Sequence, residues 1–485
     1  MNLRSKLILV VVLLLYLFLG LSHSKKQGFW HDEVYTLTFL KGVSVYNFEG
    51  SVWLEQDSVY DVNHFKSLLE QDDFYTNFST QILHEGHPPL YFAALKLWSY
   101  VFGASEVALR SFSLCCGLIS FLVLFNLFRQ RSKRKYTAWV VLVMLLFNPF
   151  LFYFSTEARM YTLAFLLATL SFKYWLDYQE HRKLKSNAFL YFCLSSIGLL
   201  YTHYYGLFFL SSLGFIELLR VGLKRSILNY GIALICFLPW GFVIRKQLSF
   251  HSVHWTDGII SLSDSFKGYL DGIANLLISP MANPLLYEWV ILIGILTIIV
   301  VFLFIKELKF TLILLASILI YGIQVFVFDQ LVEHHSILVP RYYIFVLIFI
   351  YWGIFIMIDV SYKIPSLFVP IAYSILTVTI LFQLYKLERA PKQMFREVAE
   401  FVDAQVDSKT RVLVLEPKGP LMLGVAYYLR NNFELIPANI APDSLGASAV
   451  YIDEMLGVPN RENKYHREQQ ENLKFIPFVG IFLYK

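Results

Sequence analysis

Apolar runs of about 17–25 residues recur along the chain and alternate with short segments rich in lysine and arginine. A helix of that length matches the hydrocarbon thickness of a bilayer. The first run, LILVVVLLLYLFLGL, follows Arg4 and Lys6, as in a signal peptide. We expect an uncleaved first span instead, because the run is long and lacks a convincing small-residue cleavage site. The pattern therefore predicts a polytopic helical membrane protein.

The basic clusters predict the side of the membrane that each loop faces. Lysine and arginine gather in cytoplasmic loops. Five such clusters follow the first span, at 129–135, 181–185, 220–225, 306–309 and, more weakly, 361–363. If these clusters are inside, the N-terminus is inside and the long polar segment 23–104 lies outside. Lys25 and Lys26 count against this orientation, but the later clusters outweigh them.

The apolar stretch 88–103 conflicts with this orientation if it crosses the membrane, because the strongest basic cluster would then lie outside. It is also short, roughly 24 Å at the helical rise, and it contains Lys96. We therefore predict an interfacial helix at 88–103 and the second span at 105–128. Nine further spans are expected, at about 137–154, 158–178, 187–202, 204–220, 226–246, 285–305, 310–328, 342–359 and 365–386. The total of eleven places the C-terminus outside.

The tail from about residue 388 is charged and no longer reads as a membrane span. Its periodicity predicts helices and strands in alternation, with helices at 394–406 and 420–432 and strands at 411–417, 448–453 and 475–485. We expect a transmembrane domain at 1–387, in which 23–104 forms a first outer loop with interfacial helices. A small soluble extracytoplasmic α/β domain is expected at 388–485.

The composition agrees with a membrane protein, because 57% of the residues are hydrophobic, only 16% are charged and the mean hydropathy is +0.55. The net charge of +5 does not indicate nucleic-acid binding, because the cations lie in short loops between spans. All four cysteines lie in apolar runs without metal-ligand spacing, which favours a packing role.

Ionisable side chains gather on the predicted outer face. They include Asp32, Glu33, His87, Glu106, Arg110, Glu157, Arg159, His203, Tyr204, His334, His335 and Arg341. Such groups cost free energy at a membrane boundary unless they are paired, hydrated or used. Together they suit an anionic lipid-linked substrate, because arginine can bind phosphate through two hydrogen bonds. A carboxylate nearby can take the proton of an acceptor hydroxyl.

Some members of this set also have structural interpretations. Acids such as Asp32 and Glu33 are favoured at a helix start by the helix dipole. Glu106 and Arg110 are four residues apart and fit a salt bridge along one helix.

The remaining residues divide between structural and functional interpretations. Glu157 and Arg159 are two residues apart, so they do not face each other along a helix and must reach different partners. His203 fits an interfacial histidine without a role as well as it fits a ligand-binding one. His334 and His335 have no third ligand at metal spacing.

Four motifs in a fixed order resemble a known family. The acidic pair after the first span is followed by HPPLYFAALKLW, SEVALRSFS and STEARMYTLAFLLA. The chain resembles, over nearly its whole length, the bacterial members of glycosyltransferase family 39 and their relatives. These are the dolichyl-phosphate-mannose protein mannosyltransferase-like and aminoarabinose lipid A transferase-like enzymes of the GT-C class. The resemblance implies about eleven spans, a large first outer loop with membrane-parallel helices, and a soluble α/β tail.

The resemblance also implies a function. The enzyme would be an inverting transferase that moves a monosaccharide from a polyprenyl-phosphate carrier to a lipid, protein or glycan acceptor. Asp32 would be the general base, with Glu33 as its neighbour. Donor and phosphate binding is expected from the other outer-face residues, namely His87, Glu157, Arg159, His203, Tyr204 and Arg341. Arg341 is the candidate for the lipid phosphate, and we expect no metal or other cofactor. The site and the tail would face the extracytoplasmic side of the plasma (inner) membrane.

Three other classes predict different patterns. A transporter or flippase predicts internal repeats and charges near the membrane midplane. A polysaccharide polymerase or ligase also uses lipid-linked sugars, but it does not predict the acidic pair or the tail. A receptor or scaffold does not explain why Asp32, Glu157, Arg159 and Arg341 fall on one predicted face.

Overall fold

The computed structural model describes residues 2–43, 60–134, 136–181, 186–250, 258, 260–277, 307–360, 395–405, 411–414, 420–437, 449–454, 470–476 and 479–484. The chain divides into two compact units. The first unit comprises Met1–Leu21, Gly86–Tyr91 and Arg110–Ala390. The second unit comprises Ser22–Glu85, Phe92–Leu109 and Pro391–Lys485.

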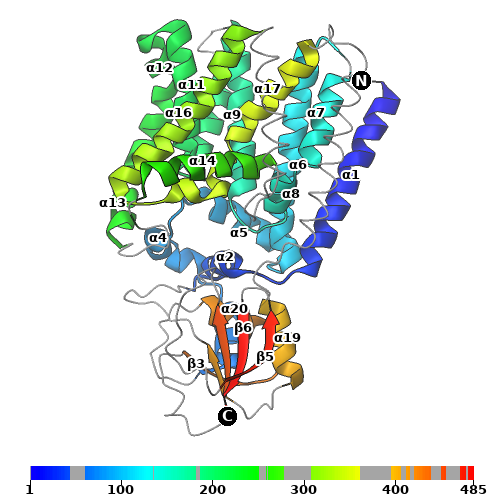
Figure 1. Cartoon of the computed structure of the whole chain (residues 1–485), viewed down its shortest axis with the longest axis vertical. Coiled ribbons are helices and arrows are strands. Elements are labelled where there is room, and N and C mark those ends of the chain that lie inside the picture. Colours follow the sequence, from blue (N-terminus) through cyan, green and yellow to red (C-terminus); the bar gives the residue numbers. More distant parts are fainter. Residues whose placement is uncertain are drawn as a thin grey trace. The chain divides into compact units, whose positions relative to one another are not determined.

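The first unit is built from helices (Figure 1). The helices that lie in it wholly or in part are α1 (Leu3–Lys26), α5 (Leu90–Phe102), α6 (Glu106–Arg131), α7 (Thr137–Leu146), α8 (Pro149–Ser155), α9 (Tyr161–His181), α10 (Asn187–Leu200), α11 (Gly206–Val221), α12 (Leu223–Phe237), α13 (Gly241–Phe250), α14 (Leu262–Leu277), α16 (Leu308–Val332) and α17 (Val346–Val360). Three short 3₁₀ helices are η1 (Leu238–Trp240), η2 (Ser336–Leu338) and η3 (Pro340–Tyr343).

The lengths of these helices bear on the predicted spans. Within the described residues, four helices are long and apolar enough to cross a membrane: α1, α6, α16 and the segment Asn229–Ser249. They become five if the bent pair α7 and α8 is one span. The predicted spans 285–305 and 365–386 fall outside the described residues. The prediction of a polytopic helical membrane protein is confirmed, whereas the count of eleven stays a prediction.

A break divides the predicted span at 137–154. Asn148 separates α7 from α8, its side chain accepts a hydrogen bond from the backbone N–H of Leu151 at 2.8 Å, and Pro149 begins α8. Proline restricts the residue before it and removes a helix donor, so a continuous helix cannot pass through this point. The two helices meet at 57°, so the predicted span, if it crosses the membrane here, is a broken one.

The helix α5 corresponds to the predicted interfacial stretch. Its 13 residues extend about 20 Å at the helical rise, less than the thickness of a hydrocarbon core. Lys96, buried at 3% exposure, donates to the backbone oxygen of Leu40 at 2.9 Å and pairs with Asp72. The lysine that counted against a membrane span therefore has an ionic partner and a backbone acceptor within the second unit.

The helix α14 packs on α8, η2 and η3, which include the Arg341 segment. This contact needs a small residue, because a Cβ added at Gly272 would come within 2.7 Å of the ring of Tyr343. The hydroxyl of Tyr269 also donates to the backbone oxygen of Ile318 in α16, at 2.6 Å. These contacts fix the backbone on which Arg341 is carried.

The second unit combines helices with a six-stranded mixed sheet (Figure 1). Its strands, in the spatial order β1-β3-β2-β4-β6-β5, are β1 (Tyr60–Asp61), β3 (Glu434–Pro437), β2 (Arg411–Val414), β4 (Ala449–Glu454), β6 (Val479–Tyr484) and β5 (Gln470–Ile476). Strand β2 is parallel to β3 and β4, and the other pairs are antiparallel. The helices are α2 (His31–Lys41), α3 (Val62–Glu70), α4 (Phe74–His84), α19 (Phe395–Gln405) and α20 (Pro420–Tyr428).

The predicted outer loop and the C-terminal tail form this unit together. Strand β1, from the loop, pairs with β3 in the tail through Tyr60 opposite Leu435. The Nζ of Lys66 donates to the backbone oxygen of Leu429 at 2.5 Å. Helices α19 and α20 and strands β2, β4 and β6 correspond to the elements predicted for the tail, although α20 ends early, at Tyr428. Strands β1, β3 and β5 were not expected. The predicted domain boundaries at 387 and 388 stay a prediction.

Candidate functional site

His203 lies in the turn that joins α10 to α11, in the first unit. Its backbone N–H donates to Leu199 at 3.0 Å, and its backbone oxygen accepts from Gly206 at 2.9 Å. The backbone oxygen of Tyr201 in the same turn accepts from Leu90 at 2.9 Å, which ties the turn to the start of α5. The turn is therefore held on both sides, and His203 is fixed within it at 2% exposure.

The hydrogen bonds of His203 determine which ring nitrogen carries the proton. The backbone N–H of Tyr205 donates to Nδ1 of His203 at 3.2 Å, so Nδ1 acts as the acceptor. In the neutral ring the proton then sits on Nε2. Nε2 is buried and has no hydrogen-bond partner among the described residues. His203 thus presents a buried N–H donor for a ligand that carries acceptor oxygens.

Basic side chains surround this donor. The rings of His87 and His203 lie 5.7 Å apart. Burial, His87, Arg341 and Arg159 together hold the pKa of His203 well below its usual value. The structure therefore brings together four of the predicted donor-binding residues. His87 lies just before α5, Arg159 before α9, His203 before α11 and Arg341 before α17. A buried group of this charge suits an anion such as a phosphate.

The lowered pKa predicts a pH dependence of stability. The unfolded chain takes up a proton at His203 near pH ~6.5, whereas the folded chain resists it. Unfolding is therefore favoured as the pH falls below that value, because the unfolded state binds more protons. We expect the loss of thermal stability between about pH 7.5 and 5.5 to be smaller in His203→Gln than in the wild type. His64→Gln, at an exposed histidine, is the control. Equal losses in the wild type and His203→Gln would contradict the assignment.

Aromatic rings flank Arg341, and the sequence reasoning missed them. The Cζ of Arg341 lies 5.8 Å from the ring centre of Tyr161 and 5.9 Å from that of Tyr342. Both rings also lie 5.8 Å from the ring of His203. Tyr161 belongs to the STEARMY motif and Tyr342 to PRYY, so the signal was present in the sequence, but neither tyrosine was among the predicted site residues.

Two other predicted residues are placed differently. Glu157 is fully buried in the turn between α8 and α9, two residues before Arg159. The hydroxyl of Tyr204 hydrogen-bonds to Gln247 and accepts from Nε1 of Trp240 at 3.0 Å. Tyr204 is thus joined to η1 and α13. A donor-binding role for Tyr204 stays a prediction.

The two acids of the second unit differ in environment. Both lie in the first turn of α2, where the helix dipole favours negative charge. Glu33 is fully buried, and its Oε2 accepts from the backbone N–H of Trp30 at 3.3 Å. This is the helix-capping role of an acid at the third helical position. Asp32 is half-buried, and its carboxylate is the more accessible of the two.

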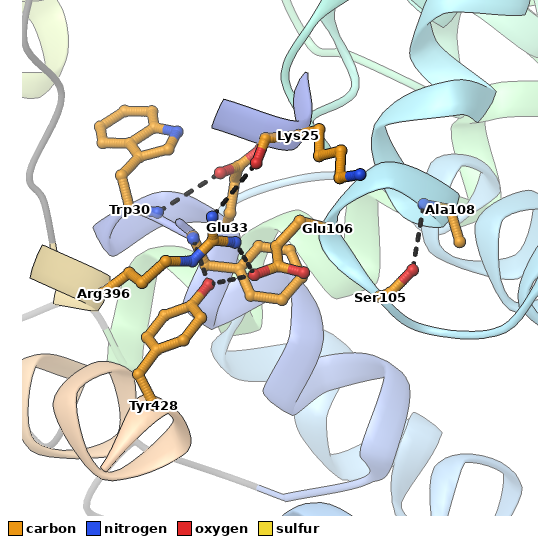
Figure 2. Close-up of polar contacts among 9 residues, drawn as sticks. Lys25, Trp30, Glu33, Ser105, Glu106, Ala108, Arg396 and Tyr428 are labelled. Atoms are coloured by element: carbon orange, nitrogen blue, oxygen red, sulfur yellow. Dashed lines mark hydrogen bonds and ion pairs between the residues drawn. The ribbon is translucent and has the colours of Figure 1, made fainter. Parts of the chain in front are cut away.

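Glu106, expected to pair along its own helix, has distant partners. Its carboxylate accepts from the hydroxyl of Tyr428 at 2.6 Å and pairs with Arg396 at 2.5 Å, both in the second unit (Figure 2). These residues lie 322 and 290 positions further along the chain. The i,i+4 spacing with Arg110 did not predict these partners, because they come from positions far along the chain.

Metal binding was not expected from the sequence, and it stays untested. Within the described ranges no three histidine, cysteine or acidic side chains are grouped as metal ligands. His334 instead lies against the ring of Phe328, with 6.5 Å between ring centres.

A known protein family matches the part of the chain that contains most of the candidate site. Residues 86–242 match the family model described as dolichyl-phosphate-mannose-protein mannosyltransferase. This range contains every predicted donor-binding residue except Arg341. No curated protein matches the chain.

Solved structures of one protein match over nearly the whole chain, and that of another matches over part of it. ArnT from Cupriavidus metallidurans in the apo state has a TM-score of 0.55 and 12% identity, covering 99% of this chain and 98% of its own. ArnT bound to undecaprenyl phosphate has the same TM-score and identity, covering 100% and 98%. The S. cerevisiae protein O-mannosyltransferase Pmt1-Pmt2 complex bound to the sugar donor has a TM-score of 0.34 and 13% identity, covering 58% and 38%. The family match and the shared fold confirm the resemblance predicted from the motifs.

Proposed function

We propose that this chain, a membrane glycosyltransferase of the GT-C class by its family match and fold, transfers a monosaccharide from a polyprenyl-phosphate carrier. The acceptor is a lipid, protein or glycan on the extracytoplasmic face. The transfer inverts the anomeric centre, and Asp32 is the general base. Undecaprenyl phosphate bound to a protein of the same fold supports this carrier class.

The observation that carries the proposal is the buried basic group around His203. A neutral histidine with a free Nε2–H among the described residues, two arginines and a second histidine form a setting for phosphate oxygens. Arg341 binds the phosphate through its planar fork, and the flanking rings of Tyr161 and Tyr342 hold that fork in place. Aromatic neighbours also offer surfaces on which a sugar or a prenyl chain can pack.

The proposed mechanism is a single in-line displacement at the anomeric carbon. The acceptor oxygen forms a bond to that carbon while the bond to the carrier phosphate breaks, and the electron pair leaves with the phosphate. The acceptor proton passes to the Asp32 carboxylate. Phosphate is a good leaving group without protonation, so one carboxylate suffices where glycosidases use two. Arginine stabilises the charge that develops on the departing phosphate.

The burial of the two acids supports different roles. Glu33 caps α2, and its hydrogen bond with the Trp30 amide would be lost if its carboxylate rotated toward the acceptor substrate. The bond to the Trp30 amide comes from Glu33 and not from Asp32. Adjacent residues on a helix point in different directions, so one of them faces the acceptor.

Sugar transfer by the purified protein tests the proposal. Labelled monosaccharides linked to polyprenyl phosphate are supplied with lipid, peptide and glycan acceptors, and the labelled product and released polyprenyl phosphate are measured. We expect both products in equal amounts. Transfer only from polyprenyl-diphosphate oligosaccharides would instead support a polymerase or ligase. Movement of the lipid-linked sugar across vesicle bilayers without transfer would support a flippase.

A further inference from the structure

The segment that joins α1 to α2 is held by side chains from the C-terminal part of the chain (Figure 2). The backbone N–H of Phe29 donates to the hydroxyl of Tyr428 at 2.6 Å. The Nη1 of Arg396 donates to the backbone oxygen of Lys25 at 3.1 Å. Helices α20 and α19 therefore each bind a main-chain atom of this segment, and all of these residues lie in the second unit.

Glu106 connects the two side chains that make these bonds. The hydroxyl of Tyr428 donates to Oε1 of Glu106, and Nη2 of Arg396 pairs with the same oxygen. Tyr428 thus accepts one hydrogen bond and donates another. Burial and the neighbouring carboxylate raise the pKa of Tyr428, so its hydroxyl stays protonated and able to donate. We call Glu106, Arg396 and Tyr428 the clamp.

The close fit of the clamp depends on a glycine. A Cβ added at Gly28 would come within 2.9 Å of the Cβ of Arg396 and 3.2 Å of the Tyr428 ring. The next residue, Phe29, is 1% exposed and lies against the ring of Tyr427, with 5.7 Å between ring centres. The segment is therefore packed against α19 and α20 as well as hydrogen-bonded to them.

The held backbone leads directly into Asp32. Helix α2 begins at His31 after its N-cap residue Trp30, so Asp32 is three residues beyond the Phe29 N–H that Tyr428 binds. The next amide, that of Trp30, is bound by Glu33. A helix start whose amides are fixed in this way holds each of its first-turn side chains in a defined orientation.

We propose that the clamp positions Asp32, so that Glu106, Arg396 and Tyr428 are positioning residues for the transfer. The inference rests on the proposed function, in which Asp32 takes the acceptor proton. It gives the C-terminal segment a role in the reaction, because α19 and α20 supply two of the three clamp residues. A small displacement of a catalytic group lowers the rate strongly without weakening substrate binding.

Tyr428→Phe tests the proposal because it removes the hydroxyl and leaves the ring. Tyr427→Phe is the matched control, since it makes the same change one residue earlier on α20. We expect Tyr428→Phe to lower kcat about tenfold, with the donor KM within about twofold of the wild type. Hydrogen exchange of the peptide that contains the Phe29 and Trp30 amides should also become faster. Tyr427→Phe should leave both quantities near the wild-type values.

The outcomes separate the clamp from the proposed function. Faster exchange with an unchanged kcat would overturn the positioning role, because the clamp would then only stabilise the fold. An unchanged exchange rate and kcat would overturn it as well, as would equal effects of the two variants. Absence of transfer by the wild-type protein would overturn the proposed function itself. That result differs from an active wild type whose kcat does not depend on Tyr428. Arg396→Lys should give a smaller loss of kcat than Arg396→Ala, since it keeps the charge next to Glu106.

Discussion

Replacing Asp32 with asparagine is expected to lower kcat for sugar transfer by about 10²–10⁴-fold, the range that a positioned general base supplies. Asparagine has nearly the same shape but cannot accept the acceptor's proton. Asp32 is only half-buried and the bond to the Trp30 amide comes from Glu33, so the fold should persist. Transfer of labelled sugar by the purified variant measures kcat, and a separate binding measurement with the polyprenyl-phosphate donor should give the wild-type affinity.

Glu33→Gln is the matched control for Asp32→Asn. A glutamine oxygen can still accept the hydrogen bond from the Trp30 amide, so α2 should remain capped. We expect a modest loss of thermal stability and a kcat within about tenfold of the wild type. Full activity of Asp32→Asn with normal donor binding would contradict the base assignment. A larger loss of kcat in Glu33→Gln than in Asp32→Asn would transfer that role to Glu33.

Replacing Arg341 with glutamine is expected to weaken binding of polyprenyl phosphate by about 10–100-fold. A hydrogen bond to a charged group contributes about 1.5–3 kcal/mol, and each ~1.4 kcal/mol corresponds to a factor of ten. The loss should be near the upper end if both guanidinium donors reach the phosphate. Binding is measured by titrating undecaprenyl phosphate into the purified protein in detergent.

Arg245→Gln is the control for Arg341→Gln, because Arg245 is an exposed arginine on α13 of the same unit. Its removal lowers the net charge equally but should leave the affinity unchanged. Equal weakening by the two variants would indicate a general charge effect. Unchanged binding by Arg341→Gln would remove Arg341 from the phosphate site and leave Arg159 and His203 as its candidates.

Part of the site could be predicted from local features of the sequence. His87, Arg159, His203 and Arg341 were chosen because their segments fall on one predicted face, and the structure brings them together. Charge and hydropathy patterns determine on which side of a membrane a loop lies, and that is enough to collect loop residues from separate helices. The same reasoning did not predict the contacts of Tyr204 with Gln247 and Trp240, because they join the turn to residues about 40 positions further along the chain.

Other parts required contacts between distant positions. The partners of Glu106 lie about 300 residues along the chain, and no periodicity connects them. The same holds for β1, which pairs with β3 across the length of the chain. Strand signals of two residues are too short to detect, and pairing over such separations is decided by packing rather than by local propensity.

The sequence by itself determined a polytopic helical membrane protein and a resemblance to GT-C glycosyltransferases, because composition, basic clusters and ordered motifs are properties of the chain in one dimension. It also determined the acidic pair as a candidate for the chemistry. The resemblance already assigned the base role to Asp32 and not to Glu33, and the tertiary structure added that Glu33 is buried and accepts from the Trp30 amide. It also decided that the C-terminal segment holds the start of α2, because hydrogen bonds and close packing at Gly28 exist only once residues about 400 positions apart have met.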